Sequence, residues 1–379
     1  MNLETLTYSR QNGWSIQPFP QLDSERTLII VFGASEFCDD AEPIRELKRA
    51  FPLSHFTGCS TSGEIFQDQV ADSTLSVAIA RFEHTDLATA SSSVSSAGVS
   101  FEAGAELATK LTREDLKAIL VLSDGLNVNG SDLVRGLNSC LPESVVVTGG
   151  LAGDGDRFKR TWVLDGDAPE VGRISAVGLY GNNVQVGHGS KGGWDIFGPE
   201  RTVTRSVDNV LYELDGKPAL QIYKEYLGDR ADGLPATALL FPLALRAPDD
   251  DAKELVRTVL AVDEATQSMT FAGNVVEGHK AQLMRANFER LIEGASEAAR
   301  RTRKGDAGSA ETLAIAISCV GRRLILGERA EEEIEASLEG LPAGTRQIGF
   351  YSYGEISPYA SGHCDLHNQT MTLTTITED

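Results

Sequence analysis

The sequence predicts a mixed α/β fold built from two connected α/β halves. Short apolar runs rich in β-branched residues alternate with helix-like runs along most of the chain, as in sheets covered by helices. A glycine-rich segment interrupts this alternation near the middle. The 379 residues also exceed the length that one ordinary hydrophobic core accommodates, so we expect two domains.

The amino-terminal half begins with a predicted strand and helix. Residues 27–35 (TLIIVFGAS) are apolar and β-branched, which predicts a buried strand. Residues 39–51 (DDAEPIRELKRAF) carry acidic residues early and apolar residues at helical spacing, which predicts a helix. The alternation continues with predicted strands at 75–82, 117–125 and 144–150 and predicted helices at 101–111 and 130–141.

The chain changes character between residues 181 and 205, where glycine and proline are frequent and no period is sustained. We place the domain boundary there, with a first domain at 27–200 and a second at 201–377. The second domain is predicted to contain a strand and helix within 210–228, a strand at 237–245, a hairpin at 257–273, a helix at 287–301, a strand at 313–320, a helix at 330–340, and strands at 346–354 and 369–377.

Composition and charge exclude several classes of protein. A formal net charge of −21 disfavours binding to nucleic acid, which requires clustered Lys and Arg. The five cysteines form no CxxC pair, which argues against a disulfide framework or a thiolate zinc site and favours a reducing compartment. The amino terminus lacks a basic segment followed by an apolar run, and the sequence contains no long apolar stretch. We therefore expect a cytoplasmic protein without membrane insertion.

Two similar segments suggest that the halves are related. GCSTSGEI at 58–65 and GFYSYGEI at 349–356 share glycine, hydroxyl-bearing residues, Glu and Ile in comparable register, and each follows a predicted strand. A third segment, GGLAGDG at 149–155, also closes a helix and strand unit. Such short similarities indicate a pseudo-repeat but do not establish one.

The glycine-flanked turns are the first candidates for a ligand site. Glycine allows backbone N–H groups to approach a ligand closely, and the hydroxyl groups and glutamates of the turns add donors and acceptors. The alternative is a polar β-turn whose Glu caps backbone N–H groups, and the residues do not decide between the two. The candidate ligand-binding residues in these turns are Cys59, Ser60, Thr61, Glu64, Tyr353 and Glu355.

These segments resemble those of the FIST family of bacterial sensory proteins, which pair an amino-terminal and a carboxyl-terminal FIST domain. GCSTSGEI and GGLAGDG look like hallmarks of the first domain. The carboxyl-domain hallmarks are similar to VLYELDGKPALQIYKEYLG, QLMRANFERLIEGA, GFYSYGEISP and LHNQTMTLT, in the family's order. The resemblance covers the chain from about Thr27 to Thr377.

The resemblance implies a sensor of a small ligand without catalytic activity. Family members usually work with histidine kinases, diguanylate cyclases or chemotaxis-type outputs, and this chain carries no such output domain. We therefore expect it to regulate a separate signalling partner. The generic ligand of the family is a small metabolite such as an amino acid, which would be held in a colourless protein by a charged clamp such as Arg285 or Arg205.

Residues 189–205 are also similar to the linker of a haem-binding branch of the family that senses nitric oxide. Haem iron needs one axial ligand, and His188, His279 and His367 are the alternative candidates. His188 ends a predicted apolar strand at 184–188 and opens a glycine-rich loop, where a macrocycle could approach and pack on Trp194 and Phe197. Haem is thus the more specific of the two predicted ligands, and an interaction scaffold without a ligand is a third hypothesis.

The sequence gives no sign of an enzyme. Ser60, Ser62 and Ser123 lie outside any GxSxG motif, and no GxxxxGK[ST] loop occurs. The glycine-rich residues 149–155 are followed by a predicted strand instead of the helix that a dinucleotide site needs. We therefore predict that no residue acts catalytically.

Overall fold

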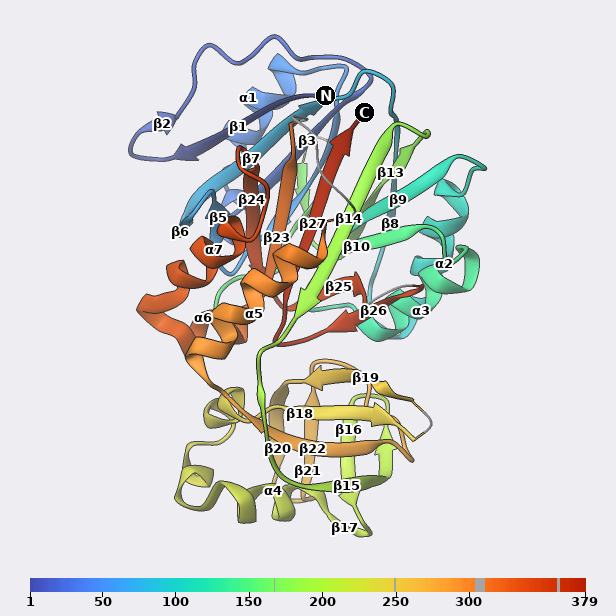
Figure 1. Cartoon of the computed structure of the whole chain (residues 1–379), viewed down its shortest axis with the longest axis vertical. Coiled ribbons are helices and arrows are strands. Elements are labelled where there is room, and N and C mark those ends of the chain that lie inside the picture. Colours follow the sequence, from blue (N-terminus) through green and yellow to red (C-terminus); the bar gives the residue numbers. More distant parts are fainter. Residues whose placement is uncertain (167, 249, 304–310, 360–361) are drawn as a thin grey trace.

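The computed structural model describes residues 1–166, 168–248, 250–303, 311–359 and 362–379. Figure 1 shows a large α/β body and a smaller body beneath it. The large body combines the chain up to β14 (Val184–Lys191) with everything from α5 (Phe288–Arg301) onward. The predicted α/β fold in two domains is confirmed. The predicted boundary between residues 200 and 201 lies within β15 (Asp195–Val207), the strand by which the chain enters the small body.

Three mixed sheets form the large body. The first has the order β12 (Ala168–Glu170), β11 (Val163–Asp165), β4 (His55–Ser60), β3 (Thr27–Gly33), β7 (Thr74–Arg81), β1 (Asn2–Ser9) and β2 (Gly13–Trp14). The second has the order β26 (Cys364–His367), β25 (Gly354–Pro358), β10 (Val146–Leu151), β9 (Leu116–Ser123), β13 (Arg173–Tyr180) and β8 (Asp86–Ser93). The third has the order β14, β27 (Met371–Glu378), β23 (Leu313–Cys319), β24 (Arg346–Ser352), β5 (Glu64–Phe66) and β6 (Gln69–Ala71).

The three sheets share one topology. In each, a parallel pair (β3 with β4, β9 with β10, or β23 with β24) is flanked by an antiparallel strand that returns beside the first member. The hairpin that follows each pair leaves its own sheet: β5 joins β24, β11 joins β4, and β25 joins β10. The similar segments predicted to be related are the junctions at which these hairpins leave. The repeat is therefore threefold and lies within the large body.

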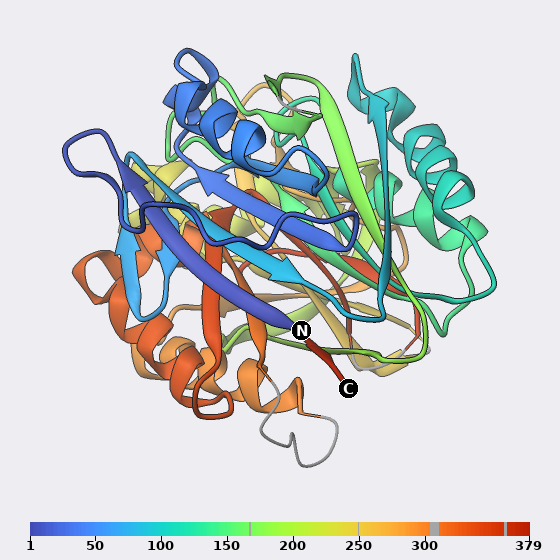
Figure 2. The ribbon, with the colours of Figure 1, turned by 90° about the horizontal axis from the view of Figure 1, so that it is seen from above.

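Helices cover the outer face of each sheet, as the view from above shows (Figure 2). Apolar residues of α1 (Glu42–Ala50) pack on the first sheet, those of α2 (Ser100–Leu111) and α3 (Gly130–Cys140) on the second, and those of α5 and α7 (Ala330–Glu339) on the third. Asn129 caps α3 by accepting hydrogen bonds from the backbone N–H groups of Ser131 and Asp132 at 3.0 and 3.2 Å. The remaining helical segments of the large body are α6 (Val320–Leu326) and the 3-10 turns η1 (Ser35–Cys38), η2 (Ala97–Val99) and η5 (Gly327–Arg329).

The inner faces of the three sheets meet in a central core. Residues of β3 alternate, so that Ile30 and Phe32 face this core whereas Ile29 and Val31 face α1. This two-sided burial explains why the strand reads as a continuous apolar run and not as an alternating one. The ring of Phe32 lies 4.6 Å from that of Phe350 on β24, which joins the first and third sheets across the core.

The glycine-rich segment at 181–205 forms two strands, β14 and β15, where the sequence showed no period. Its glycines permit close packing of α5. A Cβ on Gly187 would lie 2.0 Å from the carbonyl oxygen of Thr302, and a Cβ on Gly189 would lie 2.1 Å from that of Ala298. Glycine is required on this face of β14 because the helix backbone occupies the space of a side chain.

The small body is one eight-stranded antiparallel sheet with its own core. It comprises β15, β16 (Val210–Leu214), β17 (Lys217–Pro218), α4 (Ala219–Leu227), η3 (Gly228–Gly233), η4 (Ala236–Leu240), β18 (Leu243–Ala247), β19 (Asp250–Arg257), β20 (Val259–Asp263), β21 (Ser268–Phe271) and β22 (Lys280–Arg285). Polar contacts join it to the large body: Arg257 donates to the carbonyl oxygen of Leu366 at 3.0 Å, and Asn129 donates to Asn274 at 2.9 Å. Within the described part of the chain, no helix is long and apolar enough to span a membrane.

Candidate functional site

The three hairpin junctions meet at one end of the large body. The backbone N–H of Ser62 donates to the carbonyl oxygen of Tyr351 at 2.8 Å, and that of Tyr351 donates to Gly63 at 2.9 Å. The third junction joins them, because the N–H of Gly153 donates to the oxygen of Ser60 at 2.9 Å. The glycine-flanked turns predicted from the sequence are therefore in direct contact.

Glu64 and Glu355 hold equivalent positions in two of these junctions. One carboxylate oxygen of Glu64 accepts from Thr61, and the other accepts from the backbone N–H and hydroxyl of Thr74 at 2.9 and 2.8 Å. Glu355 repeats this pattern, accepting from Ser352 at 2.8 Å and from Thr370 at 3.2 and 2.8 Å. Each glutamate therefore ties its turn to the start of the returning strand, which supports the alternative interpretation of a structural cap.

Burial raises the pKa of both carboxyl groups. It raises the pKa of Glu64 to about 7, although hydrogen bonds from Thr61 and Thr74 oppose the rise. Burial likewise raises the pKa of Glu355 to about 8, against the hydrogen bonds from Ser352 and Thr370. Both groups are thus easily protonated near neutral pH, and neither is a permanent anion on which a cationic ligand could depend.

A cleft of about 540 Å³ opens where the junctions converge. It lies beyond the carboxyl ends of β3, β4 and β23, the edge of a parallel arrangement at which ligands commonly bind. Five acidic side chains and two arginines line it. The lining residues are Ala34, Glu36, Thr61, Ser62, Gly63, Glu64, Asp72, Ser73, Asp154, Gly155, Asp156, Arg157, Val320, Arg323, Leu324 and Gly327.

Arg323 and Asp72 form the ion pair in the wall of this cleft. The two guanidinium nitrogens donate to the two carboxylate oxygens at 2.8 and 2.7 Å, and one of them also donates to the carbonyl oxygen of Ser62 at 2.6 Å. The guanidinium lies 5.6 Å from the ring centre of Tyr351. The hydrogen bond from Arg323 holds the pKa of Asp72 below its usual value. The Asp72 side chain is 69% exposed, so a ligand in the cleft can reach it.

The opposite wall comes from the loop after β10. Arg157 donates to Glu36 at 2.5 Å and to Ser35 at 3.0 Å, which fixes the loop to η1. Asp154 is buried and accepts from the hydroxyl of Tyr353 and from two backbone N–H groups. Burial opposes ionisation of Asp154, but these hydrogen bonds prevail and lower its pKa. The loop therefore forms a wall that hydrogen bonds hold in place, and Asp154 gives this wall a negative charge.

The predicted ligand-binding residues fall into separate groups. Thr61 and Glu64 line the cleft, and Tyr353 supports it through Asp154. Ser60 lies just below, fully buried, where its hydroxyl accepts from the backbone N–H of Trp162 at 3.0 Å. Cys59 faces the central core, and burial raises the pKa of its thiol well above the usual value, so it acts as an apolar side chain.

The other predicted ligand residues lie outside the cleft. Glu355 is fully buried beside Thr370. Trp194 is buried in the layer between α5 and the third sheet, where its indole N–H donates to the carbonyl oxygen of Gln369 at 2.8 Å. Arg285, at the end of β22, is exposed beside Phe197 of the small body. Arg205, the alternative clamp, pairs with Glu213 at 3.1 Å on the small body.

The three candidate haem ligands lie in three different places, and none lines the cleft. His188 is on β14, opposite Thr374, and α5 occupies the open face of the glycines on either side of it. The side chain of His188 itself lies on the other face of β14, the face of Val184 and Val186, because side chains alternate along a strand. His279 precedes β22 in the small body. His367 is buried on β26 with its Nε2 2.9 Å from the carbonyl oxygen of Ser357, a structural contact.

Sequence reasoning missed the charged walls of the cleft, namely Arg323, Asp72, Arg157 and Asp154. Arg323 lies in the helix that follows the buried strand β23, and in βα units residues just after a strand line the edge at which ligands bind. Its position in the sequence could therefore have identified it as a candidate. Asp154 lies within GGLAGDG, which resembles a hallmark of the first FIST domain but was not among the predicted ligand-binding residues. The pairing of Arg323 with Asp72 joins residues far apart in the chain and left no local pattern.

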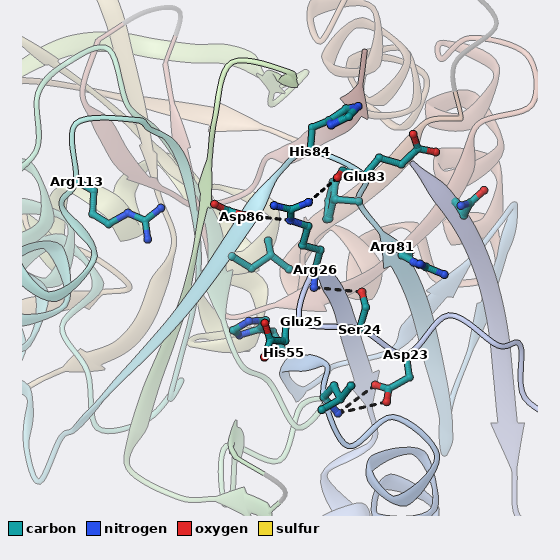
Figure 3. A pocket seen from close by; sticks show the side chains of 14 residues that line it. Asp23, Ser24, Glu25, Arg26, His55, Arg81, Glu83, His84, Asp86 and Arg113 are labelled. Carbon is teal, nitrogen blue, oxygen red and sulfur yellow. Dashed lines mark hydrogen bonds and ion pairs between the residues drawn. The ribbon is translucent and has the colours of Figure 1, made fainter.

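A larger cavity, of about 1220 Å³, lies at the opposite ends of β3 and β4 (Figure 3). Arg26 at its centre donates to Asp86 at 3.0 Å and to the carbonyl oxygen of Glu83 at 2.8 Å. Figure 3 shows Arg81 directed away from this pair and Arg113 well apart from it, so the charged groups do not converge on one point. We therefore place the candidate site in the smaller cleft, where all three junctions meet.

Comparison with protein families agrees with this architecture. The model of the FIST N domain matches residues 27–217, and the model of the FIST C domain matches residues 219–358. No curated protein matches the chain. The FIST N match covers the first two repeated units and the start of the small body, and the FIST C match covers the rest of the small body and much of the third unit. The chain belongs to the FIST family, whose domains are small-ligand sensory domains in signal transduction.

Proposed function

We propose that the protein senses a small metabolite carrying both an ammonium and a carboxylate group, as an amino acid does, in the cleft beside Arg323. The observation that carries this proposal is the ion pair between Arg323 and Asp72 in the cleft wall. A zwitterion can insert between the two side chains, its carboxylate replacing Asp72 on the guanidinium and its ammonium replacing Arg323 on the carboxylate. Both charges of the protein then remain paired.

The remaining charges of the cleft favour such a ligand. Glu36 and Asp156 add carboxylates at the opposite wall, where Arg157 is the only further cation among the lining residues. This acidic excess favours the ammonium end. The short hydroxyl and glycine residues of the turn at 61–63 leave space for a ligand backbone, as expected for a site that selects polar groups.

A panel of amino acids and primary amines tests the proposal, with thermal unfolding and titration calorimetry as readouts. A ligand at a hundred times its dissociation constant should stabilise the protein by about 2.7 kcal/mol. Asp72→Asn and Arg323→Gln should each weaken binding at least about tenfold, because each leaves one end of the ligand without its charged partner. Arg205→Gln, which alters a similar ion pair on the small body, is the matched control and should bind normally. The absence of any hit at millimolar concentration would reject this ligand class.

Haem as a sensor of nitric oxide is the more specific function that the linker resemblance implies. Its test is an absorption spectrum of protein expressed with ample haem precursor, before and after addition of nitric oxide. A Soret band that shifts with the gas and is lost in one of His188→Ala, His279→Ala or His367→Ala would support it and name the axial ligand. A colourless protein that takes up no added haem would reject the haem proposal and leave only the metabolite proposal.

We further propose that the protein binds its ligand without changing it and signals to a separate partner in the cytoplasm, such as a histidine kinase or a diguanylate cyclase. The lining of the cleft supports the first point, because it includes hydroxyl groups but no histidine to activate them. The five cysteines support a reducing location, since the sequence has no CxxC pair and none of the five forms a disulfide. Incubating the ligand found in the panel with the protein and recovering it unaltered by mass spectrometry would test the absence of catalysis.

A further inference from the structure

Two consecutive arginines on α6 point in different directions from the helix and join different parts of the molecule. Arg323 faces the cleft and binds Asp72. Arg322 is fully buried and paired with Glu333 at 2.5 Å. Since α6 spans only Val320–Leu326, a displacement of one arginine that moves the helix also moves the other.

Arg322 holds both chain segments that connect the small body to the large one. Its guanidinium donates to the carbonyl oxygen of Gly192, just after β14, and to that of Leu291, in the first turn of α5, at 2.8 Å. Figure 1 shows these two segments as the links between the bodies. They also pack against each other, because a Cβ on Gly193 would lie 2.1 Å from the carbonyl oxygen of Arg290. We name residues 192–195 and 286–291 the root of the small body.

A second path joins the cleft to the same point through Tyr351. Its backbone contacts the turn at 62–63, and its ring lies beneath the guanidinium of Arg323. Its hydroxyl donates to Glu333 at 3.0 Å, the carboxylate that binds Arg322. The cleft and the root are thus linked by direct contacts through both α6 and β24.

The root itself is held by polar contacts. Asp195 accepts from Asn287 at 3.2 Å and from Arg290, which ties the incoming segment to the outgoing one. Elsewhere the small body meets the large one through hydrogen bonds of Asn274 and Arg257 and through Ala244, Val256 and Met284, which pack in one apolar core with α5 and the third sheet. This apolar core includes Trp194 and Leu291 of the root, so a shift of the root also changes the packing of the small body.

We propose that the small body is the output element of the sensor and that its orientation is set by the Arg323–Asp72 pair through α6, Arg322 and the root. This inference rests on the proposed function in that a ligand inserting into the pair is the natural trigger. A ligand that draws Arg323 away from Asp72 shifts α6, changes the hydrogen bonds of Arg322 to Gly192 and Leu291, and so releases the small body.

Amide hydrogen exchange of the full chain without any ligand tests this coupling, because the ion pair can be broken by substitution. In Asp72→Asn and Arg323→Gln we expect exchange at 192–195 and 286–291 to accelerate at least about fivefold, the lower end of couplings between protein sites. Asp72 is exposed, so Asp72→Asn keeps the fold and decides the matter if Arg323→Gln unfolds. Arg205→Gln is the control and should leave the root unchanged.

Unaltered exchange at the root in Asp72→Asn, with faster exchange confined to residues 62–74 around the cleft, would overturn the coupling. The measurement uses no ligand, so its result is independent of the metabolite panel. An empty panel together with a coupled root would reject the ligand class alone, whereas a bound amino acid with an uncoupled root would reject the output path alone.

Discussion

Replacing Glu355 by glutamine should flatten the dependence of stability on pH. The pKa of this buried carboxyl group is raised from 4.5 to about 8. A group whose pKa is higher in the folded state contributes stability that is fully present below pH 4.5 and is lost as the pH rises through about 8. At about 1.4 kcal/mol per pH unit, the loss between pH 4.5 and pH 9 is on the order of 5 kcal/mol. Glutamine cannot ionise and still accepts from Thr370, so Glu355→Gln should avoid this loss.

Urea unfolding at intervals from pH 5 to pH 9 measures the effect. The unfolding free energies of wild type and Glu355→Gln should lie closest together at pH 5 and diverge steadily up to about pH 8, with the variant the more stable at pH 9. Glu297→Gln, at a partly exposed position on α5, is the control and should follow the wild-type profile. Parallel profiles for wild type and Glu355→Gln would refute the assignment of Glu355 as a buried, proton-holding cap.

Two further substitutions test the packing and the charge network. Gly189→Ala should lower the free energy of unfolding in urea by about 1–3 kcal/mol, because the new Cβ would lie 2.1 Å from the carbonyl oxygen of Ala298. The control Gly98→Ala should cost less than about 1 kcal/mol, because its Cβ meets only one atom, at 3.9 Å. Equal costs would count against the tight contact of α5. Burial opposes ionisation of Glu378, but three backbone N–H groups and Thr85 lower its pKa to about 2, so its stabilisation is present above pH 4.5 and lost as the pH falls through 2. Glu378→Gln should therefore cost about 1–3 kcal/mol in unfolding at pH 7 and progressively less on acidification, and a cost that does not depend on pH would contradict the assignment.

The sequence predicted the α/β class, and the fold confirms it, because strands such as β3 are apolar on both faces and helices such as α1 have clear periodicity. It also predicted the glycine-flanked turns, and these lie together. It predicted a strand that ends at His188 but missed the rest of β14 and all of β15, because glycines such as those that accommodate α5 remove the alternation by which strands are recognised. It missed Arg323 and Asp72 because their pairing depends on the exchange of hairpins between units, which no local pattern encodes.

The exchange of hairpins also constrains how the chain folds. Strand β5 pairs with β24, so Phe66 can pair with Ile348 only after the ribosome has synthesised the chain that far. The third sheet cannot close before nearly the whole chain has left the ribosome, and such distant pairing makes folding slow. Until then β5 presents an unpaired edge to other chains. Shortened forms that end before β24 should therefore aggregate, and the repeated units cannot be prepared one at a time.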